Sequence, residues 1–175
     1  MAQRANPSGF VPRLMKHRWL DEADTRKAIP EDLVRRLTER VAASERRHTG
    51  EIRIYVEAGL PFSYLWRKAT ARERAVAMFG KLRVWDTEHN NGVLIYLLLA
   101  EHAIEIVADR GLNSRVAPAT WQEIVARMGS AFRNGRFEDG LTQALGEVSA
   151  LLVEHFPADA DSVNPNELPD EPVLG

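Results

Sequence analysis

The sequence has no cysteine, and its 175 residues contain no long apolar run. Without cysteine, the chain has no disulfide framework and no thiolate for catalysis or metal binding. The longest apolar run, residues 92–100, is about half of the roughly 20 residues that a membrane-spanning helix needs. We therefore expect a soluble, cytoplasmic protein with no transmembrane segment and no export signal.

The common catalytic signatures are missing as well. The sequence contains no glycine-rich dinucleotide motif, Walker loop, nucleophile elbow, zinc-protease motif or EF-hand loop. Their absence excludes the enzyme classes that depend on those motifs. It favours either an unusual site or a protein without catalysis.

Positive and negative charges are unevenly distributed between the two halves of the chain. Residues 1–83 carry 18 Lys/Arg and 10 Asp/Glu, a net charge of +8, whereas residues 84–175 carry 5 and 15, a net charge of −10. The two halves could meet in the fold, or the basic half could bind nucleic acid. Nucleic-acid binders usually add a recognisable motif or an aromatic platform to the charge, and none of the common ones occurs here. We therefore expect no nucleic-acid partner.

The chain is predicted to form one domain with two unstructured ends. Residues 1–18 are expected to be a flexible basic arm, because Asn6-Pro7-Ser8-Gly9 breaks any regular structure. Residues 19–156 form the domain. Residues 157–175 contain four prolines, several acids and few large apolar side chains, which predicts a disordered acidic tail.

Hydrophobic periodicity predicts helices and strands in alternation. Apolar residues recur at helical spacing after Pro30, after the capping box Thr70–Glu73, and over 118–131 and 137–156. Three strands are expected, over 51–58, 93–99 and 104–109. In the first, Ile52, Ile54 and Val56 form an apolar face, and the alternating residues Arg53, Tyr55 and Glu57 form the other face. The second is apolar on both faces, which is typical of a central strand.

These elements predict an α/β fold, a three-layer α/β/α sandwich around a small mixed sheet. The helical crossover between the first two strands makes them parallel, with a right-handed connection. The short connection over residues 100–102 makes the last two strands an antiparallel hairpin.

The strand directions bring polar residues to one edge of this sheet. The segments before the two parallel strands meet the segment that follows the third strand, and their carboxylate and amide oxygens suit a hard divalent cation. The predicted metal ligands are Asp86, Asn90, Asn91, Asp109 and Glu51. A cation there could polarise a phosphate, which makes Asp86, His89 and Arg110 the candidate catalytic residues. The alternative is structural, because Asn90-Asn91-Gly92 is also a turn signal before a buried strand.

The opposite edge carries an aromatic loop, residues 59–69, with Phe62, Tyr64 and Trp66. One interpretation is that the loop folds over the end of the sheet and hides these rings. The other is an exposed docking patch for a protein or a membrane.

Four stretches of the chain resemble the TPM domain family. They are residues 71–80 (ARERAVAMFG), 85–96 (WDTEHNNGVLIY), 103–112 (AIEIVADRGL) and 132–141 (FRNGRFEDGL). The resemblance covers about residues 30–156 and implies an α/β/α sandwich. It is to a stand-alone soluble member, similar to the acid-phosphatase-like TPM proteins of the thylakoid lumen.

The resemblance also implies a function. TPM family members are associated with calcium binding, with acid-phosphatase activity in a plant thylakoid-lumen member, and with assembly or repair of membrane complexes. On the matching positions this implies calcium ligands at Asp86, at Asn90 or Asn91, and at Asp109. His89 in the same loop would suit a softer ion, so manganese and zinc are further candidates. We expect a module that binds a divalent cation, with weak metal-dependent or acid-phosphatase-like activity. The alternative is a non-catalytic assembly module with a protein partner at a membrane-associated complex.

Overall fold

The computed structural model describes residues 13, 15, 17, 22–159 and 165–175, and it has a four-stranded mixed sheet at its centre. The strand order is β3-β2-β1-β4. β1 (Ile52–Glu57) is parallel to β2 (Val93–Leu98), and β2 is antiparallel to β3 (Ala103–Ala108). A short 3-10 turn, η2 (Leu99–Glu101), closes the hairpin. The predicted parallel crossover and hairpin are both confirmed.

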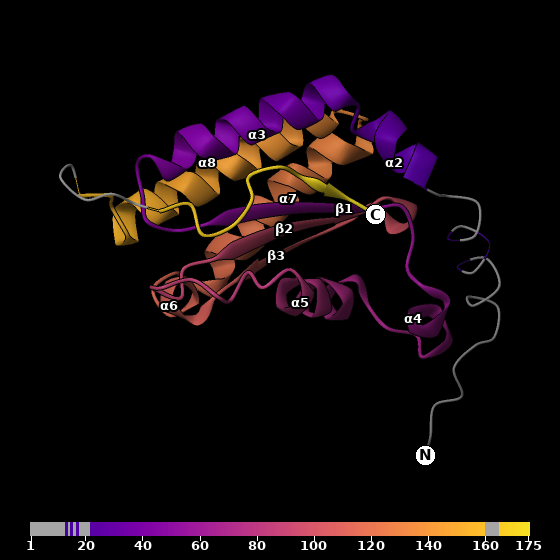
Figure 1. Ribbon diagram of the computed structural model, residues 1–175. Coiled ribbons are helices and arrows are strands. Elements are labelled where there is room, and N and C mark those ends of the chain that lie inside the picture. The colour runs from indigo at the N-terminus through magenta and orange to yellow at the C-terminus, as the bar shows by residue number, and fades with distance from the viewer. Residues whose placement is uncertain (1–12, 14, 16, 18–21, 160–164) are drawn as a thin grey trace, which may run out of the picture.

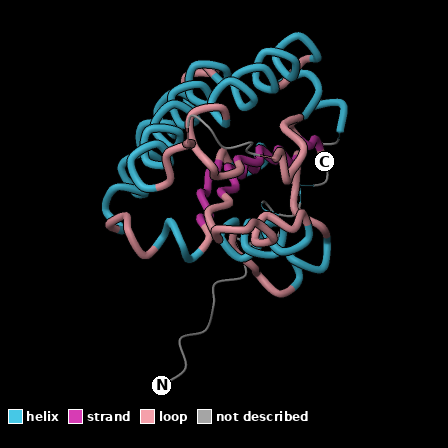
Figure 2. The backbone as a smooth tube through the Cα atoms, turned by 60° about the vertical axis from the view of Figure 1, so that its left-hand side comes forward, coloured by secondary structure: helices cyan, strands magenta, loops and turns pink. Residues whose placement is uncertain are grey.

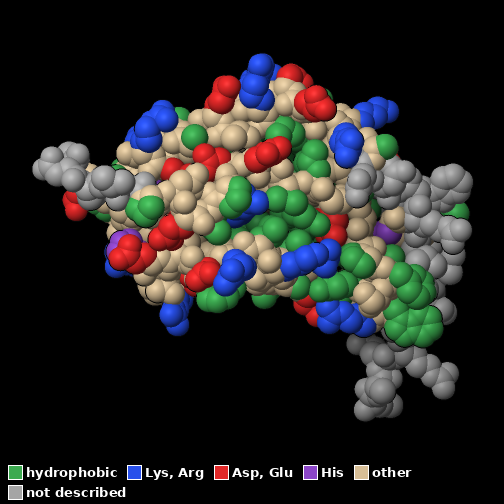
Figure 3. Space-filling view, viewed as in Figure 1, with side chains coloured by type: hydrophobic (Ala, Val, Ile, Leu, Met, Phe, Trp, Pro, Cys, Tyr) green, Lys and Arg blue, Asp and Glu red, His purple; other side chains and the backbone are tan. Residues whose placement is uncertain are grey.

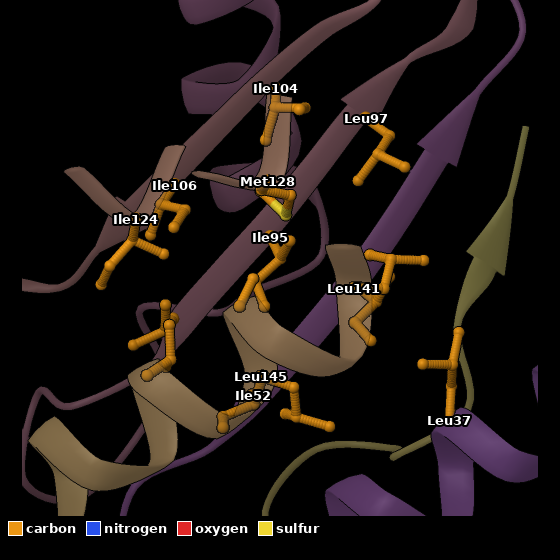
Figure 4. Packing of buried hydrophobic residues seen from close by; sticks show 14 of the residues in the cluster. Leu37, Ile52, Ile95, Leu97, Ile104, Ile106, Ile124, Met128, Leu141 and Leu145 are labelled. Carbon is orange, nitrogen blue, oxygen red and sulfur yellow. The ribbon is translucent and has the colours of Figure 1, made fainter. Parts of the chain in front are cut away.

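One face of the sheet is covered by three long helices. They are α3 (Glu31–Glu45), α7 (Pro118–Arg133) and α8 (Phe137–His155), and they form the upper layer in Figure 1. The apolar stripes of these helices pack on the isoleucine-rich face of the strands, and Figure 4 shows Met128 and Leu141 near Ile95, with Leu37 of α3 farther along toward the C-terminal strand. This face holds the larger of the two hydrophobic clusters, because three amphipathic helices share it.

The other face is covered by the crossover between β1 and β2. This segment contains α4 (Phe62–Trp66) and α5 (Ala71–Lys81). The Thr70 hydroxyl accepts from the Glu73 amide at 3.2 Å, and the Glu73 carboxylate accepts from the Thr70 amide at 2.7 Å, so the predicted capping box begins α5. Figure 2 shows the strands between helices on both sides, which confirms the three-layer sandwich.

Two short helices complete the described elements. α2 (Glu22–Ala28) precedes α3, and α6 (Arg110–Asn113) follows β3 directly. No helix among the described residues is long and apolar enough to cross a membrane.

The second face of β1 is buried as well as the apolar one. Arg53, Tyr55 and Glu57 are 5–6% exposed, compared with 0–1% for Ile54 and Val56 between them. The crossover helix α5 lies over this face and supplies Arg74 as the partner of Glu57, whereas Arg53 donates to Glu171 O in the C-terminal segment.

The prediction of a disordered tail over 157–175 is wrong for residues 165–175. β4 (Val173–Leu174) pairs in parallel with β1, placing Val173 beside Tyr55. The Gly175 amide donates to Val56 O at 2.8 Å, and Gly175 O accepts from the Ala58 amide at 2.9 Å. Backbone hydrogen bonds hold this segment, which is why its proline-rich composition gave no sign of it. Residues 160–164 of the tail lie outside the described residues.

Most of the predicted flexible arm over 1–18 also lies outside the described residues. Two of the three described positions contact the domain. The Arg13 guanidinium donates to Ala69 O at 2.6 Å, and His17 Nδ1 accepts from the Leu60 amide at 2.8 Å. These two positions are anchored to the aromatic loop, in contrast to the freely mobile arm that was expected.

Candidate functional site

Three segments meet at the edge of the sheet where β1 and β2 begin and β3 ends. The Asn91 side-chain amide donates to Thr49 Oγ1 at 3.2 Å, which joins the loop before β2 to the segment before β1. The Asp109 amide donates to Gly92 O at 2.8 Å, which joins the same loop to the end of β3. The strand directions predicted that these segments converge, and they do.

Two glycines allow this close approach. A Cβ atom on Gly111 would lie 2.5 Å from Asn90 O and 2.6 Å from His89 O. A Cβ on Gly92 would lie 1.9 Å from Val84 O. Any larger residue at either position would push the loop before β2 away from its neighbours. The Asn-Gly signal thus marks a turn and also a close contact.

Two buried side-chain oxygens at this edge have no hydrogen-bond donor among the described residues. They are Asn91 Oδ1 and Asp109 Oδ2. Asn91 is completely buried, and the other oxygen of Asp109 accepts from the Arg110 amide at 2.7 Å as the cap of α6. Leaving a buried acceptor unsatisfied costs about 1–3 kcal/mol. Both residues lie at the start of β2 and the end of β3, next to the backbone bond between Asp109 and Gly92.

Arg110 adds a positive charge beside them. Its Nε donates to Asn90 Oδ1 at 3.1 Å, and the guanidinium is exposed to solvent. Among the predicted site residues, the structure therefore brings together Asn90, Asn91, Asp109 and Arg110.

Asp86 and Glu51 have other partners. The Asp86 carboxylate is at the surface, 3.2 Å from the Arg83 guanidinium. Glu51 is buried, and its carboxylate accepts from the amides of Glu167 and Leu168, both at 3.2 Å. Burial raises the pKa of Glu51 above its usual range. Its partners make Glu51 an anchor for the C-terminal segment, a contact that sequence reasoning missed.

The two histidines of this edge differ in exposure. His89 is at the surface in the loop before β2. His48 is buried between the Ser44 hydroxyl at 2.8 Å and Gly50 O at 3.0 Å. Burial lowers the pKa of His48 to about 4, so the ring is neutral and structural. No group of three or more His, Asp or Glu side chains in the described part of the chain is arranged to hold a metal ion.

The family model of the TPM domain matches residues 23–151, which include β1, β2, β3 and the segments that meet at this edge, whereas β4 lies outside the match. The chain belongs to the TPM domain family. The resemblance in the four sequence stretches is thereby confirmed. No curated protein gives a significant sequence match.

Two solved structures show the same fold. The NMR structure of the BA42 protein from the psychrophilic bacterium Bizionia argentinensis superposes with a TM-score of 0.70 at 24% identity, covering 86% of this chain and 94% of that chain. The N-terminal domain of a protein from P. gingivalis gives a TM-score of 0.56 at 21% identity, covering 69% of this chain and 76% of that chain. At these identities the likeness concerns the fold alone.

A buried polar network lies under the crossover of this TPM domain. The Glu57 carboxylate accepts from Arg74 Nε at 2.9 Å, from Arg74 Nη2 at 2.5 Å and from the Tyr96 hydroxyl at 2.8 Å. Burial, and then the negative charge of Glu57, raise the pKa of Tyr96 far above its usual range, so this hydroxyl stays protonated. All three groups have partners, Glu57 and Tyr96 are buried, and the Arg74 side chain is only 12% exposed, which favours a structural role.

The aromatic edge of the TPM domain lies at the opposite end of the strands. α4 buries Leu65, but Phe62 and Trp66 are 61% and 72% exposed, and their ring centroids are 6.0 Å apart. Figure 3 shows hydrophobic side chains gathered at this corner, beside Lys and Arg. Of the two interpretations left open by the sequence, the structure favours exposed rings.

Proposed function

We propose that the edge around Gly92 binds a divalent cation, with calcium as the first candidate. The observation that carries the proposal is the pair of buried, unpartnered oxygens on Asn91 and Asp109. A cation bound to these oxygens would take the place of the missing donors, and its binding free energy would offset the cost of burying them. A third oxygen could come from Asn90 once its side chain leaves Arg110.

The chemistry of these donors supports a hard ion. The site offers one carboxylate and amide oxygens, which calcium and manganese accept and which zinc accepts less readily. Zinc would draw on the exposed imidazole of His89 in the same loop. With a single carboxylate, the affinity should lie toward the weak end of the protein range, because ligand charge tunes calcium affinity.

Isothermal titration calorimetry with calcium, manganese and zinc tests the proposal. Asp109→Asn keeps the size of the side chain and the cap of α6 but removes the charge, so calcium affinity should fall at least roughly tenfold. Asp86→Asn is the matched control, an acid in the neighbouring loop that pairs with Arg83 at the surface. It should change the affinity less than about twofold. No heat at millimolar metal, or equal losses in both variants, would overturn the proposal.

Weak phosphoester hydrolysis is the reaction that we propose for this site. The exposed guanidinium of Arg110 is suited to bind phosphate oxygens, and His89 is a candidate to hold the proton for a leaving group. A bound cation would supply Lewis-acid stabilisation. Turnover of p-nitrophenyl phosphate should fall in Arg110→Gln and in Asp109→Asn. Turnover that is equal in both variants and the wild type would mean a contaminant.

The second candidate function is a non-catalytic interaction module at a membrane-associated complex. The exposure of Phe62 and Trp66 favours it, because two neighbouring aromatic rings rarely stay in water without a partner. Trp66→Ala should weaken capture of that partner and leave cation affinity unchanged. An unchanged capture would remove this candidate.

A further inference from the structure

The α4 corner, formed by Phe62–Trp66 and the following Arg67 and Lys68, combines exposed aromatic rings with a buried leucine beneath them. Phe62 and Trp66 project into solvent, whereas Leu65 on the same helix is buried in the smaller hydrophobic cluster. In Figure 1 this helix forms a projecting corner at one end of the sheet. The rings are therefore presented on a fixed support, at a convex part of the surface.

Positive charge follows directly after these rings. The Arg67 guanidinium lies over the Tyr64 ring, 4.3 Å from its centroid, and remains exposed. Lys68 is exposed and has a left-handed backbone, with φ 55°. Glu101, a nearby carboxylate, is neutralised by Arg13 at 2.6 Å.

Two described residues of the N-terminal sequence contact the same corner. Arg13 and His17 both contact the aromatic loop, and Met15 between them is 54% exposed. The first 20 residues of the sequence carry four Lys/Arg and no carboxylate.

We infer that the α4 corner docks on the surface of an anionic lipid bilayer, with Phe62 and Trp66 in the headgroup region and Arg67 and Lys68 on lipid phosphates. This deepens the interaction function proposed above, on which it rests, and it is independent of the cation site. Trp and Lys/Arg are the side chains typical of membrane interfaces.

Vesicle co-sedimentation in EDTA tests the inference without any divalent cation. The full chain should bind vesicles of phosphatidylcholine with about one-third phosphatidylglycerol, bind pure phosphatidylcholine weakly, and dissociate as salt rises. Phe62→Ser with Trp66→Ser should weaken binding more than about tenfold, because both rings lose their burial in lipid. Arg67→Gln with Lys68→Gln should weaken it about 25-fold, at about fivefold for each cation.

Trp85→Ser is the matched control. Trp85 is 49% exposed but lies before β2, at the other end of the strands, so this variant should bind like the wild type. Urea unfolding of each variant checks that the fold is kept. Absent binding of the wild type, binding independent of lipid charge, or an equal loss in Trp85→Ser would overturn the inference. Self-association is the other outcome that overturns it. In that case the wild type binds no vesicles but self-associates, and the Phe62/Trp66 variant is monomeric.

Discussion

Arg110 Nε donates a hydrogen bond to Asn90 Oδ1 at 3.1 Å, across the edge where β2 begins and β3 ends. This bond places a fixed positive charge next to the two unpartnered oxygens of Asn91 and Asp109. If the edge binds a cation, Arg110 holds Asn90 Oδ1, the proposed third ligand, and its charge repels the ion.

The first prediction follows from that competition. Arg110→Met should raise calcium affinity roughly threefold, because the screened repulsion disappears and Asn90 Oδ1 becomes available. Arg133→Met, an exposed arginine at the end of α7, changes the net charge equally and should have little effect. Calorimetric titration of both variants with calcium measures the two affinities. A lower affinity in Arg110→Met would mean that the guanidinium supports the site.

The buried network under α5 gives the second prediction. Glu57→Ala should lower the free energy of unfolding by about 3–5 kcal/mol, because it leaves the Arg74 guanidinium and the Tyr96 hydroxyl buried without their acceptor. Glu105→Ala removes a half-exposed partner of Arg72 at 3.6 Å and should cost less than about 1 kcal/mol. Urea unfolding measures both. Similar losses for the two variants would contradict the assigned role of Glu57.

The third prediction concerns pH. Glu45 is buried under the C-terminal segment, where its carboxyl accepts from the Ile52 amide at 2.9 Å. Burial above all, with the charges of Glu51 and Asp170, raises the pKa of Glu45 from 4.5 to about 9. The folded protein therefore binds a proton that the unfolded chain releases, and stability should be lost as the pH rises from about 4.5 to about 9.

Glu45→Gln tests this sign. The amide keeps the acceptor for Ile52 but cannot ionise, so the variant should be more stable than the wild type at pH 8 by at least about 1 kcal/mol. Glu39→Gln, on the exposed face of α3, is the control and should follow the wild type. Urea unfolding at several pH values gives the comparison. A variant that loses stability with rising pH as steeply as the wild type would refute the assignment.

The fourth prediction concerns the C-terminal segment. Deletion of residues 165–175 should lower the free energy of unfolding by about 2 kcal/mol, since it removes the donors to Glu51 and exposes apolar surface beneath Leu174. The Ala58 amide, which donates to Gly175 O at 2.9 Å, should then exchange with solvent faster. Pro169→Ala in this exposed stretch is the control. Unchanged exchange at Ala58 would show that β4 contributes nothing to that edge.

Much of the fold could be predicted from local patterns. The apolar run from Val93 predicts a central strand, and Pro30 and the Thr70–Glu73 box mark the starts of α3 and α5. These signals depend on residues close in the sequence, which is why they sufficed. Burial of Arg53 and Glu57 depends on the distant Arg74 and on the returning C-terminal segment, so alternation within the strand could not predict it.

The candidate site was predicted only in part. Strand direction was enough to bring Asn91 and Asp109 to one edge, because parallel pairing and a hairpin fix where each strand begins and ends. The roles of Glu51 and Asp86 could not be predicted, because an acid in a loop looks the same whether it binds a cation, a backbone amide or an arginine. Those partners come from residues 83, 167 and 168, and only the folded chain selects them.

The most direct test of the cation site is a calcium titration followed by proton–nitrogen NMR. The backbone amides of Gly92, Asp109, Arg110 and Gly111 should shift first and together, with one dissociation constant, and Asp109→Asn should abolish these shifts at the same calcium concentration. Amide shifts that stay unchanged at this edge, or that appear first among other acids such as Asp86 or Glu154, would contradict the account.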